Sequence, residues 1–152
     1  MKRLLVIPLI ALAVSCSRGG DATTQVPADT ASKLLIDRNW IDVWPESKDE
    51  PLHVYRFVPS MGGGVYQDRT LYAGTFELFL FKVHGNEIAF DMPHRGDDMR
   101  TRFRIDRVDS PKPFDLKLTL TNSPRGPAVY YSIEAGLGHV DALLANRGAS
   151  TR

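Results

Sequence analysis

A run of acidic residues and four scattered histidines are the side chains of this 152-residue chain that could hold a metal ion. The histidines are His53, His84, His94 and His139. None is paired at the spacing of a zinc-binding helix or a zinc ribbon. The densest group of potential cation ligands, in the segment 91–98, is Asp91, His94, Asp97 and Asp98. Turns are rich in Asp and Gly for backbone reasons, and Arg95 would repel a cation. We therefore interpret this segment as a hairpin turn and expect neither a metal ion nor another cofactor.

Motifs for nucleophilic or phosphate chemistry are absent from the sequence. No G-x-S-x-G elbow occurs, and Gly62–Gly64 is not followed by Lys and then Ser or Thr, as a phosphate-binding loop would require. Isolated Ser, His and Asp residues occur in any chain of this size. We predict no catalytic residue and a protein that is not an enzyme.

Arginines alternate along one stretch of the chain, at Arg100, Arg102 and Arg104, with Arg95 and Arg107 close by. They could form a patch for an anionic headgroup or a partner protein. Alternatively, they form a solvated outer strand face, paired with Asp or Glu of neighbouring strands. We favour this second interpretation.

The N-terminus has the three parts of a secretory signal. Two cations, Lys2 and Arg3, precede an uncharged apolar run over 4–14, and the small residue Ser15 follows it. The run is too short for a membrane-spanning helix, which needs about 20 apolar residues. After removal of the signal, 17 of the 19 basic residues remain against 18 acidic ones. This balance gives no electrostatic basis for binding nucleic acid.

The four residues Ala13–Cys16 resemble the lipobox of bacterial lipoproteins, in which small residues precede the cysteine that receives the lipid. Cys16 is the only cysteine of the chain, and acylation would consume its thiol. The resemblance implies a palmitate-type anchor on Cys16 and attachment to a membrane. Ser17, a residue other than Asp after the cysteine, implies the bacterial outer membrane, with the protein facing the periplasm or the cell exterior.

The sequence thus divides into four parts. Residues 1–15 are the predicted signal peptide, and 16–32 are the lipidated cysteine with a flexible tether rich in small and polar residues. Residues 33–146 have the length of one domain, and 147–152 are expected to be a disordered tail.

Alternation of apolar and polar residues dominates the domain and predicts antiparallel strands with one buried face. The strands are expected at 53–58, 65–72, 75–83, 87–92, 100–108, 114–121 and 129–133. The segment 75–83 is apolar on both faces, so we expect it to be central or covered by another element. Val140, Leu143 and Leu144 have helical spacing and predict a short C-terminal helix. Regular turn signals between the strands favour an all-β barrel of about eight strands.

Short motifs over about residues 34–134 resemble those of bacterial lipocalin-like domains. They are Leu35 to Trp40, Val54 to Pro59 followed by glycines, Gly74 to Leu78 with Asn86 to Ile88, and Leu116 to Thr119 with Tyr130-Tyr131. The resemblance implies an antiparallel up-and-down barrel, with Trp40 closing its base and a small hydrophobic ligand as one kind of partner. It supplies no catalytic residue.

Two functions remain open. In the first, the barrel is a non-enzymatic binding or interaction module of the cell envelope, with a pocket for a small hydrophobic ligand. The aromatic residues expected to line such a pocket are Tyr55, Phe57, Phe79, Phe81, Phe90, Phe103, Phe114 and Tyr131. In the second, the barrel is packed and ligand-free, and serves as an accessory subunit of an envelope protein assembly. The large inward side chains favour a filled interior.

Overall fold

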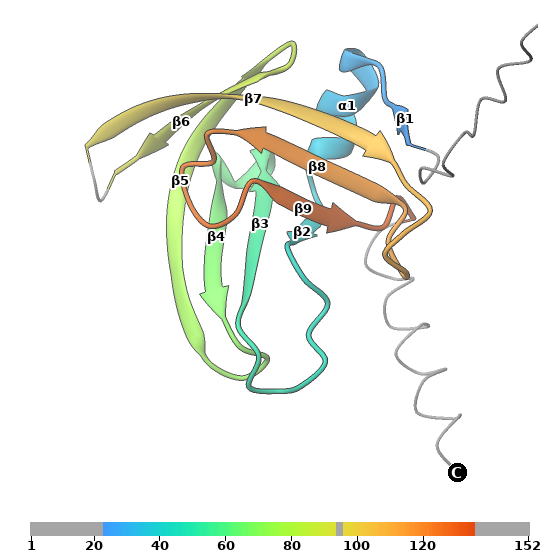
Figure 1. Ribbon diagram of the computed structural model, residues 1–152. Coiled ribbons are helices and arrows are strands. Elements are labelled where there is room, and N and C mark those ends of the chain that lie inside the picture. The colour runs from blue at the N-terminus through green and yellow to red at the C-terminus, as the bar shows by residue number, and fades with distance from the viewer. Residues whose placement is uncertain (1–22, 94–95, 136–152) are drawn as a thin grey trace, which may run out of the picture.

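The computed structural model describes residues 23–93 and 96–135, and most of its elements are strands (Figure 1). In chain order they are β1 (Thr24–Gln25), α1 (Ala28–Leu35), β2 (Asn39–Ile41), β3 (Leu52–Val58), the 3-10 helix η1 (Pro59–Met61), β4 (Gly63–Arg69), β5 (Gly74–His84), β6 (Glu87–Met92), β7 (Asp97–Arg107), β8 (Leu116–Thr121) and β9 (Val129–Ser132).

The eight strands β2 to β9 form a closed antiparallel barrel. Each strand pairs with its successor in the sequence, from β2–β3 to β8–β9, and Ile41 of β2 pairs with Tyr131 of β9. The alternation of apolar and polar residues specifies this arrangement, because one side of each strand must be buried. The predicted all-β up-and-down barrel is confirmed.

The two longest strands, β5 and β7, change partners along their length. Strand β5 pairs with β4 through Gly74–Phe79 and with β6 through Leu80–His84. Strand β7 pairs with β6 in its first half and with β8 in its second half. The extra strand β1 pairs with the end of β7, through Thr24 and Gln25. In the first half of β5, therefore, one edge pairs with β4, and the edge on the side of β6 has no partner among the described strands.

The N-terminal segment that the sequence predicted as a flexible tether is partly ordered. Residues 24–35 hold β1 and α1, and the predicted domain start at residue 33 falls inside this helix. Ala31, Leu34 and Leu35 lie three and four positions apart and are buried in the core, which explains why the segment folds as a helix. The helix packs against β7, and the Ser32 hydroxyl donates to the Gly85 carbonyl at the β5–β6 turn.

Helix α1 and Trp40 close one end of the barrel. The indole of Trp40 is fully buried, and its Nε1–H donates to the Leu35 carbonyl at 2.9 Å. Trp40 is therefore held in the core next to the end of α1. At the same end Phe79 lies over Gly64, where a Cβ atom would come within 2.4 Å of the Phe79 ring. Only glycine leaves room for this ring.

Several predicted features lie outside the residues that the structure describes. They are the signal peptide, Cys16, the C-terminal helix around residues 140–144 and the tail 147–152. Over residues 23–93 and 96–135, no helix is both long enough and apolar enough to cross a membrane.

Candidate functional site

Five of the eight aromatic residues predicted to line a pocket lie in the barrel core, and they fill it. Tyr55, Phe57, Phe79, Phe90 and Phe103 are all buried. The ring centroids of Phe57 and Phe79 are 5.5 Å apart, and those of Phe79 and Phe90 are 5.2 Å apart. These are the separations of packed aromatic pairs. Rings such as these pack against one another in the barrel interior.

The other three predicted residues lie at the margin of the core or away from it. Phe81 is half-buried and packs on Phe57, with ring centroids 5.2 Å apart. Phe114 stacks on Tyr131 at 5.6 Å and contacts Trp44 at 5.8 Å. Tyr131 follows the inward-facing Tyr130 on β9 and so faces the other side of that strand. This small cluster is separate from the barrel core.

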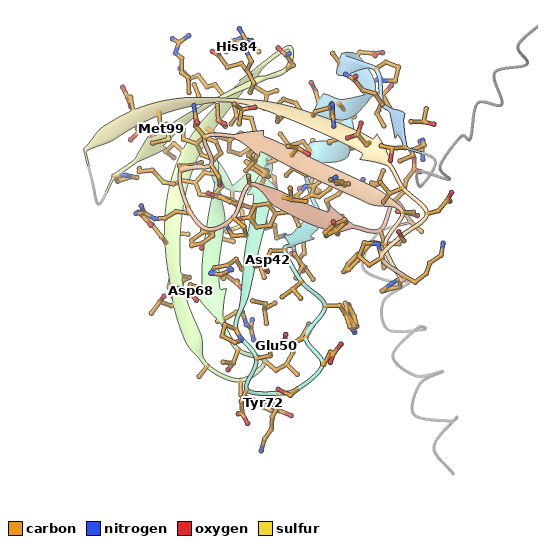
Figure 2. The ribbon with its side chains drawn as sticks, viewed as in Figure 1. Asp42, Glu50, Asp68, Tyr72, His84 and Met99 are labelled. Carbon is orange, nitrogen blue, oxygen red and sulfur yellow. The ribbon has the colours of Figure 1, made fainter. Side chains whose placement is uncertain are left out.

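The open end of the barrel, opposite α1, contains a polar cleft of about 680 Å³. Its lining residues are His53, Tyr66, Asp68, Thr75, Phe76, Glu77, Arg125 and Gly126. They come from β3, β4, β5 and the β8–β9 loop, and the β2–β3 loop adds Asp42 behind His53. Figure 2 shows Asp42 and Asp68 at this end, with Tyr72 farther out at the β4–β5 turn.

The His53 imidazole is fixed between two carboxylates. Asp42 accepts hydrogen bonds from the His53 backbone N–H at 2.7 Å and from Nδ1 at 2.6 Å. Because a carboxylate only accepts, Nδ1 carries a proton in this arrangement. The other ring nitrogen, Nε2, lies 3.9 Å from Asp68 Oδ1, and the ring stacks on Tyr66. The arrangement presents Nε2 and the Asp68 carboxylate to the cleft.

A second ion pair fastens the β8–β9 loop to β5. Arg125 donates to Glu77 through Nε at 2.6 Å and through Nη2 at 2.7 Å, and both side chains are about one-sixth exposed. Such a bidentate pair fixes orientation as well as charge. The Arg125 carbonyl accepts from the hydroxyls of Tyr55 at 3.3 Å and Tyr130 at 3.1 Å. Arg125 thus links the rim of the cleft to the core.

Burial changes the acidity of three tyrosines beneath this rim. Loss of water around the hydroxyl, together with the Asp68 and Asp42 carboxylates, raises the pKa of Tyr66 to about 12. Burial raises the pKa of Tyr55 and of Tyr130 further still. All three hydroxyls are neutral near pH 7.

The outer face of β5 carries a row of exposed apolar side chains, which we call the β5 ridge. Phe76, Leu78 and Leu80 are 72%, 53% and 50% exposed. The sequence predicted that this strand is central or covered by another element. It is central in the strand order, between β4 and β6, but its outer face is exposed in the described part of the chain. The inner residues, such as Phe79, enter the core, whereas nothing described covers the outer ones.

The arginine-rich strand β7 is mainly an ion-paired outer face. Arg100 contacts Glu87 at 3.2 Å, and Arg104 contacts Asp106 at 2.9 Å. Arg107 forms two hydrogen bonds with Glu134, which lowers the pKa of that carboxyl group. The Arg100–Glu87 pair joins neighbouring strands, as the favoured interpretation expected. The other two carboxylates differ from that expectation, because Asp106 lies on β7 itself and Glu134 follows β9.

Among the side chains that the structure describes, no group of three or more His, Cys, Asp or Glu residues is arranged to hold a metal ion. His94 of the acidic hairpin turn lies outside the described residues.

Comparison with known proteins does not identify a relative of this chain: no family model, no curated protein and no solved structure matches it.

Sequence reasoning did not identify the residues of the cleft as a group. Asp42 and His53 are eleven positions apart, and Glu77 and Arg125 are 48 apart. Only the strand register, which places Tyr55 opposite Tyr66 and Asp68 opposite Thr75, brings them to one rim. The one available signal was the position of His53 and Asp68 at strand ends that meet at the same end of a barrel.

Proposed function

We propose that this protein is a lipid-anchored, non-enzymatic interaction module of the bacterial cell envelope. In this proposal the barrel presents the β5 ridge to a partner protein. The observation that carries the proposal is a filled interior beside exposed apolar side chains on one strand. Exposed apolar patches of this kind are a common feature of protein interaction sites.

The packing of the core supports this function over that of a carrier for a small hydrophobic ligand. A ligand inside the barrel would have to separate aromatic rings such as Tyr55 and Phe79, whose centroids are 5.8 Å apart. Ligand sites generally exist before the ligand binds. Native mass spectrometry of the purified full chain separates the two functions. A reproducibly co-purifying apolar molecule would favour the carrier.

The membrane attachment rests on the sequence around Cys16. Replacement of this residue, Cys16→Ala, is expected to abolish metabolic labelling with palmitate and to release the protein from membranes. The matched control is Ser17→Ala, which leaves the thiol in place. Labelling that persists in Cys16→Ala would overturn the anchored form of the proposal.

The interaction surface can be tested by photocrosslinking in cells. A benzoylphenylalanine introduced at Phe76 is expected to give protein adducts, whereas the same group at Lys117 on β8 is not. The added substitution Leu78→Lys should remove the adducts, because a charge on the ridge would have to be buried in the complex. Adducts of equal yield at both positions, or yields that Leu78→Lys leaves unchanged, would refute a role for the ridge.

A further inference from the structure

Half of strand β5 has an open edge. Gly74–Phe79 pairs with β4 on one side, and β6 begins to pair with β5 only at Leu80. On the side where β6 would continue, no other described strand pairs with Gly74–Phe79. Figure 1 shows β6 and β7 leading away from this lower half of β5. An open edge leaves backbone N–H and C=O groups without strand partners.

The cleft lies on the inner side of this part of β5. The cleft is bordered by Thr75 and Glu77, which face the barrel interior, and by Phe76, which faces outward. The Arg125–Glu77 ion pair holds the β8–β9 loop on the inner side and stabilises the position of the edge.

We propose that an extended segment of a partner protein adds to the open edge of β5 as a further strand. This inference rests on the proposed function and specifies how the partner binds. In strand addition, backbone hydrogen bonds supply affinity and alternate side chains supply specificity. The partner is a segment in which apolar residues alternate with basic ones.

The apolar half of this pattern follows from the β5 ridge. Residues of an added strand that point outward lie beside Phe76 and Leu78, which are 72% and 53% exposed. Cross-strand apolar neighbours stabilise a pair of strands. Valine or a similar β-branched residue at these positions would cover the ridge.

The basic half of the pattern follows from the charge of the cleft. Arg125 neutralises Glu77, whereas the Asp68 side chain is 60% exposed and has only His53 as an ion-pair partner among the described residues. Asp68 pairs in register with Thr75 of β5. Strands are about 4.8 Å apart, so a lysine opposite Thr75 is about 9.6 Å from the Asp68 backbone. The lysine can therefore extend past the small Thr75 side chain to the carboxylate.

The test uses the full chain, purified in detergent, and the synthetic peptide Thr-Lys-Val-Lys-Val-Lys-Thr. Hydrogen exchange measured by mass spectrometry reports on fragments that span residues 74–79, with fragments of β9 as the internal reference. The edge-facing amides of 74–79 should exchange about tenfold more slowly when the peptide is present at ten times its dissociation constant. A control peptide with both valines replaced by proline keeps the charge and cannot form the strand.

A variant isolates the charge contribution. Asp68→Asn should weaken binding of the lysine peptide about threefold, and it should not affect a peptide in which threonine replaces every lysine. Equal binding of the proline peptide, or no slowing of exchange at 74–79, would overturn strand addition. Slowing that appears without peptide as protein concentration rises would assign the edge to a second copy of the chain and also overturn it. Persistent photocrosslinks at Phe76 together with such a failure would leave the proposed function standing.

Discussion

Alkaline pH should unfold this protein through the three tyrosines under the cleft. Tyr55, Tyr66 and Tyr130 have folded-state pKa values raised by burial, to about 12 for Tyr66, against a value near 10 in an unfolded chain. Their stabilising contribution is therefore complete below pH 10. It is lost as the pH rises toward and through the folded-state values.

The size of the effect follows from linkage. Between pH 10 and 12 each tyrosine ionises in the unfolded chain but stays neutral in the fold, which costs about 1.4 kcal/mol per pH unit. The three together reduce the free energy of unfolding by about 4 kcal/mol at pH 11. That is a large fraction of the 5 to 15 kcal/mol typical of a domain. We expect a cooperative loss of structure above pH 11.

Urea unfolding followed by circular dichroism at pH 8, 10, 10.5 and 11 measures this slope. The variant Tyr66→Phe should reduce it by about one third, because it removes one of the three linked ionisations. Absorbance at 295 nm should show that phenolate formation by the buried tyrosines coincides with unfolding. A slope that is identical in Tyr66→Phe, or ionisation of all five tyrosines with the fold intact, would refute the reasoning.

Three further predictions concern stability, each read from urea unfolding at pH 7. Gly126→Ala should cost about 3 kcal/mol, because φ is +60° and the new Cβ would lie 2.6 Å and 2.7 Å from two tyrosine hydroxyls. Gly85→Ala, with φ of +61° and no atom within 4 Å, should cost only about 1 kcal/mol, and equal costs would contradict the steric argument. Trp40→Phe should cost about 2 to 3 kcal/mol, since it removes a buried hydrogen bond and part of the packed indole, and a cost below 1 kcal/mol would count against the role of Trp40 in closing the base. Glu77→Gln should cost about 2 kcal/mol by leaving the Arg125 guanidinium without its carboxylate. Adding Arg125→Gln should recover part of that loss, and strict additivity of the two substitutions would exclude coupling.

The strand pattern was predictable because it depends on local alternation. The strand Glu87–Met92 was expected with the bounds that the structure has, and the strand expected at 53–58 is one residue longer in the structure. Strand β6 buries one face, so the sequence records directly which of its side chains point inward, whereas β3 is buried on both faces.

Helix α1 and the cleft were not predictable in the same way. The segment before residue 33 is rich in small and polar residues, and its helical apolar positions, Ala31, Leu34 and Leu35, extend past the expected start of the domain. The exposure of Phe76 and Leu78 was missed because a strand that is apolar on both faces normally has both covered. The pairing of Glu77 with Arg125 depends on how a loop crosses the barrel end, which no local pattern records.

The seam between β2 and β9 sets the order in which this barrel can fold. It joins Ile41 to Tyr131, 90 residues apart, through one paired position, with a hydrogen bond from Ser132 Oγ to the Asn39 carbonyl at 2.8 Å. The hairpins from β3 to β6 need only near neighbours and can form early, whereas closure must wait for nearly the whole chain. Contacts of such long range slow folding to the millisecond-to-second range. Until the last strand arrives, the aromatic rings of the core remain open to water on one side.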